Sequence, residues 1–319
     1  MGGADQARVV AIFGPTAVGK TAVAIALADR LRAAGEDPVA ISADALQIYK
    51  GLEILTGAAS KAERSQLEHR LLAFVPLEET FSVGAFMPRA HAEIDRALIA
   101  GRTPIVVGGT GLYLHAALTA LDLRPQPPPA LRERLEEKLR RQGPRALHAE
   151  LVARAPAVAA RIEPADRSRL VRALELLEIG GAQTTTGDSQ LWTTSTRHPT
   201  LLIGLVMERA VLYRRIDARV DRIVAAGAHE EVRRAAAAGA SRTASKAVGY
   251  RELLAGDVDR MKVRSRNYAK RQLSWMRKLT AATTIDVTER APAEVAREIA
   301  RRRMEGGRAP PCSVRADEI

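Results

Sequence analysis

Short apolar segments alternate with amphipathic ones in the first third of the chain. Residues 8–13 are β-branched and aromatic, and residues 38–42 and 103–107 form similar short runs, so each predicts a buried strand. Residues 21–34 and 83–100 place their apolar positions at helical spacing. Because strands that alternate with helices pair side by side through crossover connections, this part of the chain predicts a parallel α/β sheet.

The pattern changes after residue 121. A proline-rich segment at 124–130 is followed by helical periodicity alone as far as about residue 181. The segment 180–199 is polar and rich in residues that break regular structure, so it predicts a loop.

Regular apolar patterning returns in the last third of the chain. Residues 200–207 predict a strand, residues 210–238 and 258–280 predict long helices, and residues 283–287 predict a last strand. The chain therefore predicts an α/β core that is interrupted by a helical insertion.

These segments define the expected domains. Residues 1–121 and 200–305 would form one discontinuous α/β core, and residues 122–199 would form an all-helical insertion domain. The last residues, 306–319, are rich in glycine, proline and polar residues, so we expect a disordered tail.

Charge is distributed unevenly along the sequence. The chain has 319 residues, with 49 lysines and arginines against 37 acidic residues, for a formal net charge of +12. Residues 245–278 hold ten of the cations and only three of the acids, so more than half of the net charge lies in one short segment. Such a concentration is typical of a surface that binds a polyanion.

Several classes of protein are excluded by composition. Cys312 is the single cysteine, so a disulfide scaffold and a cysteine-rich zinc site are both excluded. No apolar run approaches the ~18 residues of a membrane span, and the first residues do not resemble a secretory signal. We expect a cytoplasmic monomer with no membrane partner.

One segment matches a phosphate-binding motif. It reads Gly14-Pro15-Thr16-Ala17-Val18-Gly19-Lys20-Thr21 and lies between a predicted strand and a predicted helix, as the pattern G-x-x-x-x-G-K-[ST] requires. Glycines let successive N–H groups face an anion, and the helix N-terminus adds a positive dipole. We call residues 14–21 the phosphate loop, and expect Lys20 to supply mobile charge and the Thr21 hydroxyl to bind Mg²⁺. The expected core is thus similar to that of P-loop NTPases.

The phosphate loop leaves the identity of its ligand open. A nucleoside triphosphate is the default, but the strand at 103–107 leads into Gly108-Gly109-Thr110 and not into the aspartate that usually holds Mg²⁺ in NTP hydrolases. The nearest carboxylate at the end of a predicted strand belongs to Asp44. Because ligands bind at the carboxyl ends of parallel strands, we expect Asp44 and Thr110 at one site.

Further strings in a fixed order resemble a known family. They are SADALQIYKGLEI, FSVGAF, PIVVGGTGLYL, DRSRLVRALE, RAVLYRRIDARVD, SKAVGYREL and RNYAKRQLSWMR. With the phosphate loop, they make the chain similar to the tRNA isopentenyltransferase (tRNA dimethylallyltransferase) family from Val9 to about Arg277. The resemblance implies transfer of a dimethylallyl group from dimethylallyl diphosphate to the exocyclic amine of adenosine 37, beside the anticodon of tRNA.

The resemblance also implies roles for the residues that match. The phosphate loop, Arg215 and Arg219 would bind the diphosphate, with Mg²⁺ as the cofactor. Asp44 would accept the proton from the attacking amine, and Thr110 would help to hold the substrates. The acceptor base would leave the anticodon-loop stack to reach the reacting carbon.

A larger set would contact the tRNA, in part through its phosphates. The implied contacts are Asp44, Ala45, Leu46, Gln47, Thr110, Arg132, Ser168, Arg169, Leu170, Val171, Arg172, Lys246, Gly249, Tyr250, Arg251, Lys270 and Arg271. Four positions depart from the family's pattern. Ala45 replaces a serine, Arg70 a histidine, Ser168 a glutamine and Lys246 an arginine. All four concern fine contacts with tRNA and leave the groups assigned to chemistry in place.

Three other functions share some of these features. A P-loop kinase for a small molecule would leave the basic segment 245–278 unexplained. An enzyme that prenylates free adenine nucleotides would not need the helical insertion. A nucleic-acid-binding protein with a vestigial loop is disfavoured because Lys20 and Thr21 are intact.

Overall fold

The computed structural model describes residues 7–121, 123, 127–180, 195–279 and 281–305. The chain separates into two compact units. The first is made of Met1–Ala120 and Thr194–Ile319, and the second is Leu121–Thr193. The predicted tail at 306–319 and most of the predicted loop at 180–199 lie outside the described residues.

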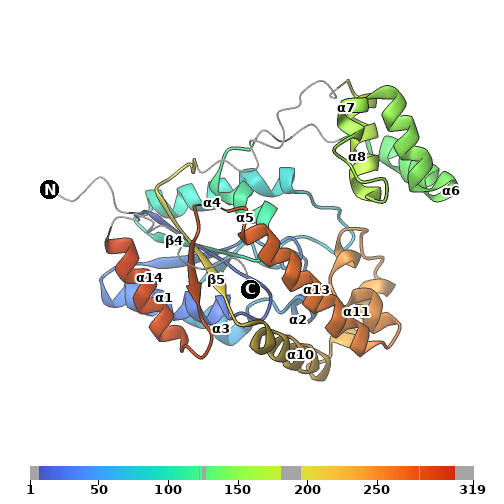
Figure 1. Cartoon of the computed structure of the whole chain (residues 1–319). Helices are drawn as coiled ribbons and strands as arrows, with labels where there is room; N and C mark the ends of the chain where they lie inside the picture. Colours follow the sequence, from blue (N-terminus) through green and yellow to red (C-terminus); the bar gives the residue numbers. More distant parts are fainter. Residues whose placement is uncertain (1–6, 122, 124–126, 181–194, 280, 306–319) are drawn as a thin grey trace. The chain divides into compact units, whose positions relative to one another are not determined.

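The first unit is built on a six-stranded sheet in which every strand pair is parallel (Figure 1). Its strand order is β3-β2-β4-β1-β5-β6. The strands are β1 (Val9–Phe13), β2 (Pro38–Ser42), β3 (His69–Arg70), β4 (Thr103–Gly108), β5 (Thr200–Val206) and β6 (Thr283–Asp286). β1 therefore pairs with one strand from each part of the discontinuous unit. The predicted α/β class and its parallel sheet are confirmed.

Both faces of β1 are covered, which explains why its sequence is apolar without alternation. Val9, Ala11 and Phe13 pack in one hydrophobic cluster with α4 (Val83–Ile99) and α5 (Gly111–Leu118). Val10 and Ile12 point to the opposite face. They pack in a second cluster with α1 (Lys20–Ala33) and α14 (Pro292–Met304), which lie side by side in Figure 1.

The remaining helices of this unit follow β2 or surround the carboxyl edge of the sheet. They are α2 (Glu53–Thr56), α3 (Lys61–Gln66), α10 (Arg209–Ala225), α11 (Ala228–Ala237), α12 (Tyr250–Leu254) and α13 (Val258–Met276), with a 3-10 turn at Ala244–Lys246. α10 packs against α13, and α11 packs against α2 and α12. The functional site lies among these helices.

The described part of the second unit is helical, as predicted for the insertion. It contains α6 (Pro129–Arg154), α7 (Pro156–Ala159) and α8 (Arg167–Glu178). α6 contains a break, because Gly143 adopts a positive φ of 79° and Pro144 follows it. Leucines of α6 and α8, among them Leu147, Leu151 and Leu174, form a small core of their own.

Two expectations about the helices need correction. Residues 210–238 form two helices and not one, because Gly227 takes a φ of 98° that ends α10 and starts α11. The predicted helix at 258–280 ends at Met276. The sequence patterns also missed short elements whose length gives little periodicity, such as α2, β3 and α12, and the longer α14.

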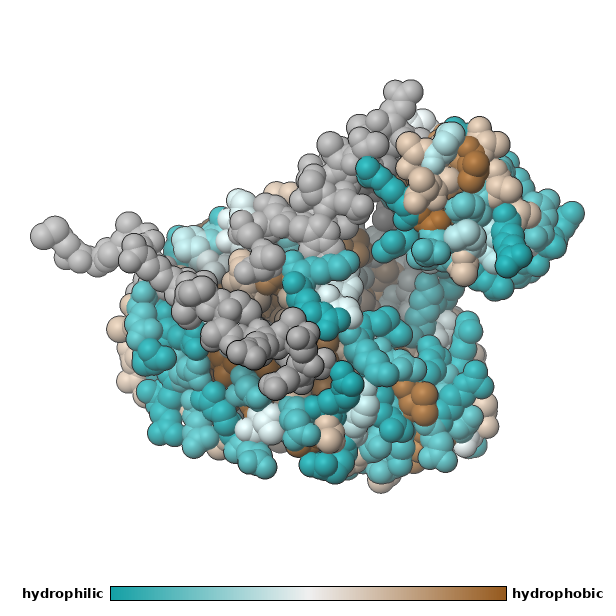
Figure 2. Space-filling view, viewed as in Figure 1, coloured by the Kyte–Doolittle hydropathy of each residue, from teal (hydrophilic) through white to brown (hydrophobic). Residues whose placement is uncertain are grey.

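The visible surface is mostly hydrophilic (Figure 2). Among the described residues, the exposed large hydrophobic side chains are Ile99, Val152, Leu254, Val263 and Met304, and each belongs to a different helix. No helix in the described part of the chain combines the length and the apolarity that a membrane crossing requires.

Candidate functional site

The phosphate loop connects β1 directly to α1. β1 ends at Phe13 and α1 begins at Lys20. Gly19, the residue before the helix, has a φ of 106°, a conformation that favours glycine. Gly14 also needs to be small, because a Cβ there would lie 2.9 Å from Val18 Cγ1 and 3.0 Å from the Leu205 carbonyl oxygen. The loop thus turns tightly against β5 and presents the N-terminus of α1 to the site.

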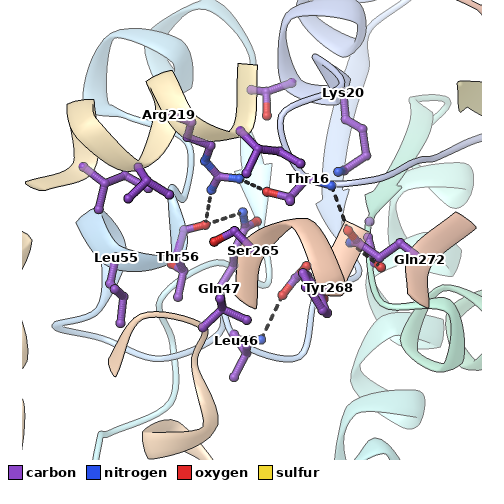
Figure 3. A pocket seen from close by; sticks show the side chains of 18 of the residues that line it. Thr16, Lys20, Leu46, Gln47, Leu55, Thr56, Arg219, Ser265, Tyr268 and Gln272 are labelled. Atoms are coloured by element: carbon purple, nitrogen blue, oxygen red, sulfur yellow. Dashed lines mark hydrogen bonds between the residues drawn. The ribbon is translucent and has the colours of Figure 1, made fainter. Parts of the chain in front are cut away.

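A pocket of about 830 Å³, part of it open to solvent, lies at the carboxyl edge of the sheet (Figure 3). It is walled by the phosphate loop, the end of β4, the segment after β2, α2, α10 and α13. Seven residues singled out from the sequence line it, namely Thr16, Lys20, Thr21, Asp44, Leu46, Gln47 and Arg219. The structure therefore brings the loop cation, the strand-end carboxylate and one of the two arginines into a single site.

Lys20 is partly buried in this pocket and bent back over its own loop. Its ammonium donates hydrogen bonds to the carbonyl oxygens of Gly14 and Pro15, both at 2.9 Å. Burial lowers the pKa of Lys20 to about 8, against the opposing effect of the Asp44 charge. A partly buried cation with a lowered pKa is suited to receive an anion that compensates its desolvation.

Arg219 reaches the site from α10. Its guanidinium donates to the Thr16 hydroxyl in the phosphate loop and, at 2.8 Å, to the backbone carbonyl of Thr56 at the end of α2. Gln47 binds the same region of α2, donating to the carbonyl oxygens of Thr56 at 3.4 Å and Gly57 at 3.2 Å. Burial lowers the pKa of Arg219, while the nearby Asp44 carboxylate raises it. Figure 3 shows Arg219 and Lys20 on the two sides of Thr16.

Arg215 has a different place from Arg219. Its side chain is exposed and does not line the pocket, although a Cβ on Gly19 would lie 3.5 Å from its Nη2 atom. Arg215 is therefore next to the loop at the start of α1, one helical turn from Arg219 on α10.

Thr110 contacts the segment that carries Asp44, although Thr110 itself is not among the residues that line the pocket. The Asp44 carboxylate accepts a hydrogen bond from the Leu46 N–H at 3.0 Å, and the Thr110 hydroxyl accepts one from the Ala45 N–H at 3.3 Å. The Thr110 hydroxyl also lies 3.4 Å from the hydroxyl of Tyr268. Burial and the Asp44 charge both raise the pKa of Tyr268, so this phenol stays neutral.

Helix α13 contributes residues that sequence reasoning missed. Ser265, Tyr268 and Gln272 lie on one face of the helix, at i, i+3 and i+7, and line the pocket (Figure 3). Only the cations of this segment were singled out from the sequence. The helical spacing of the polar residues between those cations could have indicated this face of α13 from the sequence.

The basic segment is only partly available for a polyanion. Lys262 pairs with Asp221 at 2.7 Å, and Arg266 lies 3.5 Å from Asp217, so one face of α13 is bound to α10. The expected tRNA contacts Arg251, Lys270 and Arg271 are exposed. Arg271 also covers the ring of Tyr268, 5.6 Å from its centroid, and thus connects the surface to the pocket.

Other expected tRNA contacts are placed differently. In the helical unit, Ser168 and Arg169 are exposed, whereas Arg132 and Arg172 form ion pairs with the fully buried Glu175. Four of the expected contacts have buried side chains or backbone, namely Leu170, Val171, Gly249 and Tyr250. Their contribution is to packing, and direct contact by their side chains would require them to leave the core.

The fold and the site together define a class of protein. A parallel α/β sheet whose first strand leads through a glycine-rich loop to a helix, with partly buried cations at the carboxyl edge, is typical of proteins that bind phosphorylated ligands. The IPP transferase family model matches residues 47–279. The chain belongs to this IPP transferase family.

Two relatives illustrate the similarity in sequence. The tRNA dimethylallyltransferase of Levilactobacillus brevis is 40% identical over 294 residues, which cover 88% of this chain and 93% of the relative. The tRNA dimethylallyltransferase of Thermobifida fusca is 41% identical over 285 residues, covering 86% and 88%. The match thus extends over nearly the full length of both relatives.

Solved structures agree with this assignment. The full-length tRNA isopentenylpyrophosphate transferase of Bacillus halodurans is 34% identical, with a TM-score of 0.66, and the match covers 93% of this chain and 97% of that one. A eukaryotic dimethylallyltransferase acting on tRNA has a TM-score of 0.76 at 24% identity, covering 97% of this chain and 81% of that one, and shares the fold.

Proposed function

We propose that this protein transfers the dimethylallyl group of dimethylallyl diphosphate to the N6 amine of adenosine 37 in tRNA, releasing diphosphate. The observation that carries the proposal is the arrangement of one pocket, in which Lys20 and Arg219 lie beside the carboxylate of Asp44. This alkylation requires cations that stabilise an anionic leaving group and a group that accepts a proton.

In the proposed reaction, the cations serve the leaving group and the Asp44 carboxylate serves the proton. The bond between C1 of the dimethylallyl group and the bridging oxygen breaks, and its electron pair leaves with the diphosphate. A bond forms between the adenine N6 and C1, and the N6 proton passes to the Asp44 carboxylate. The Leu46 N–H holds one oxygen of that carboxylate in place at 3.0 Å. Negative charge on the departing diphosphate would therefore develop next to the cations, and positive charge on N6 would develop next to the Asp44 carboxylate.

The cations of the phosphate loop region would stabilise the departing diphosphate. Lys20 and Arg219 lie on the pocket wall, and Arg215 lies beside the first turn of α1 where a second phosphate could extend. Because Lys20 and Arg219 are desolvated, their interaction with a developing anion is stronger than at an exposed surface.

Mg²⁺ fits the donors present at this site. The Thr21 hydroxyl lines the pocket at the end of the phosphate loop. No cluster of three or more His, Cys, Asp or Glu suited to a metal occurs in the part of the chain that is described. One or two protein oxygens completed by phosphate oxygens and water are what Mg²⁺ prefers, and bound there it would neutralise charge on the diphosphate.

Two features favour tRNA as the acceptor over a free nucleotide. The helical unit adds a second body that a small acceptor does not need. The exposed cations Arg251, Lys270 and Arg271 lie on the helices that also wall the pocket or adjoin it. Binding of a polyanion at these cations would bring an extruded base to Asp44.

The test is prenyl transfer with matched acceptors. Purified protein with Mg²⁺ and radiolabelled dimethylallyl diphosphate is offered unmodified tRNA, AMP, ADP or ATP. We expect label in tRNA alone and at adenosine 37. Label in the nucleotides would assign the protein to the class that prenylates free adenine nucleotides, and consumption of ATP without label transfer would assign it to the kinases.

A further inference from the structure

Gln272 joins two separate parts of the pocket. Its side-chain oxygen accepts a hydrogen bond from the N–H of Thr16, in the phosphate loop, at 2.8 Å. Its side-chain nitrogen donates to the carbonyl oxygen of Gly109, after β4, at 2.7 Å. The residue is only 3% exposed, so both ends of the amide are satisfied inside the protein. Figure 3 shows the side chain beneath Lys20, reaching from α13 toward the loop.

The turn after β4 is shaped to receive α13. A Cβ on Gly109 would collide with the Gln272 side-chain nitrogen, and a Cβ on Gly111 would lie 2.5 Å from the ring of Trp275. Gln272 and Trp275 are three residues apart on α13, so both contacts come from one turn of the helix. The missing side chains of the two glycines therefore leave the space in which this helix turn docks.

The same helix turn carries cations to the surface. Lys270 and Arg271 immediately precede Gln272 and are exposed, while Gln272 points inward. One rigid helix turn thus presents the expected tRNA contacts on one side and a hydrogen bond to the phosphate loop on the other. If RNA displaced α13, the Gln272 side-chain oxygen that accepts from the Thr16 N–H would move with it.

We propose that Gln272 is a positioning residue that couples occupancy of the tRNA surface on α13 to the affinity of the phosphate loop for diphosphate. It acts by holding the Thr16 amide and the Gly109 turn in a fixed relation, and does not touch the reacting atoms. The proposal rests on the proposed function, because it takes tRNA as the polyanion and diphosphate as the loop ligand. Linkage requires the coupling to be reciprocal.

The experiment measures the dissociation constant of inorganic pyrophosphate, with Mg²⁺, by calorimetry in the absence and in the presence of saturating unmodified tRNA. For the wild-type protein we expect tRNA to change this constant at least about fivefold. Gln272→Met keeps the length of the side chain and removes both hydrogen bonds. We expect it to weaken pyrophosphate binding about tenfold and to reduce the effect of tRNA to less than about twofold.

Two further variants protect the test against a folding defect. Gln272→Glu keeps the size and an acceptor for the Thr16 N–H but loses the donor to Gly109 and adds a negative charge beside the loop, so its readout is the loss of the tRNA effect and not the pyrophosphate affinity alone. Gly109→Ala displaces the Gln272 amide from the other side of the contact and should have the same effect. Asn267→Ala, on the exposed face of α13, is the matched control and should behave as the wild type. Each variant is compared with the wild type for its unfolding temperature.

Two outcomes would overturn the proposal. One is a wild-type pyrophosphate affinity that does not respond to tRNA, and the other is a Gln272→Met variant in which the response is unchanged. Prenyl transfer by the wild type is assayed in parallel. Failure of transfer with normal coupling would count against the proposed function alone, whereas normal transfer without coupling would count against the role of Gln272 alone.

Discussion

The guanidinium of Arg219 donates a hydrogen bond to the backbone carbonyl of Thr56 at 2.8 Å. This contact joins α10 to the last residue of α2 and leaves the other side of the guanidinium directed at Thr16 in the phosphate loop. The direction of the cation is therefore set by a backbone carbonyl and not by an acidic side chain. An arginine held in this way keeps its full charge for an incoming anion.

Arg219→Lys should impair the use of dimethylallyl diphosphate while tRNA binding persists. A lysine keeps the charge but cannot donate to Thr16 and Thr56 in the fixed geometry of a guanidinium. We expect the KM for dimethylallyl diphosphate to rise about tenfold, which steady-state kinetics would measure. Arg222→Lys is the control, because Arg222 is exposed on the same helix. An unchanged KM in Arg219→Lys would contradict the assigned direction of the cation.

Glu231 supports the same arrangement from α11. Its buried carboxylate accepts hydrogen bonds from the N–H groups of Ile54 at 2.9 Å and Leu55 at 2.7 Å, and so fixes α2. Glu231→Ala leaves two buried donors unpaired and should lower the free energy of unfolding by about 1–3 kcal/mol. Glu231→Gln keeps one acceptor and should lose less. Denaturant titration measures both, with the exposed Glu230→Ala, which removes only a charge from the first turn of α11, as the reference.

Asp44→Asn should abolish prenyl transfer and spare tRNA binding. The asparagine keeps the shape of the side chain and an acceptor for the Leu46 N–H, but it cannot take the N6 proton. Loss of a general base lowers kcat by about 10²–10⁴. Single-turnover transfer and a filter-binding assay with tRNA separate the two effects. A kcat within twofold of the wild type would end the assignment of Asp44 as the base.

Lys20 predicts a pH dependence of anion binding. Burial lowers its pKa from 10.5 to about 8, so the ammonium is charged below pH 8 and loses its proton as the pH rises through that value. The Lys20 contribution to pyrophosphate affinity should therefore be complete near pH 7 and fall by up to about tenfold per pH unit above pH 8. Titrations from pH 7 to pH 9.5 measure this. Lys20→Met should bind pyrophosphate weakly, and its affinity should lack the decrease above pH 8. Equal pH profiles for the wild type and Lys20→Met would contradict the expectation.

The exposed cations predict a salt dependence of tRNA affinity. Each phosphate contact adds about 0.7–0.9 to the slope of log affinity against log salt concentration. Lys270→Met should reduce the slope by about that amount, because Lys270 is exposed. Lys262→Met should leave the slope as it is, since Lys262 is paired with Asp221 at 2.7 Å. A wild-type affinity that is flat between 50 and 200 mM salt would rule out phosphate contacts as the basis of binding.

Local patterns predicted the parts of the molecule that depend on neighbouring residues. The strands at 38–42 and 103–107 and the helix at 83–100 agree with β2, β4 and α4 to within one residue. The phosphate loop was found because its glycines and lysine occupy fixed positions over eight residues. Asp44 and Thr110 followed from the rule that strand ends meet at one edge.

The rest of the site depends on contacts between distant parts of the chain. Gln272 meets the loop at Thr16, 256 residues earlier, and Tyr268 meets Thr110 across 158 residues. Arg219 lines the pocket and Arg215 does not, although the two lie four residues apart on α10, and no spacing of residues encodes this difference. Such relations appear only once the helices are packed against the sheet.

The central position of β1 has a consequence for synthesis of the chain. β5, its partner on one side, begins at Thr200, about 190 residues after β1 ends at Phe13. At about 5–20 residues per second, roughly 10–40 s pass on the ribosome before β5 emerges. During that interval the segment Val-Val-Ala-Ile-Phe of β1 has an open edge of unpaired amides and carbonyls. At least one edge of β1 therefore stays open until β5 emerges, including the time in which the helical insertion is translated, and that is the interval in which a chaperone would protect the nascent protein.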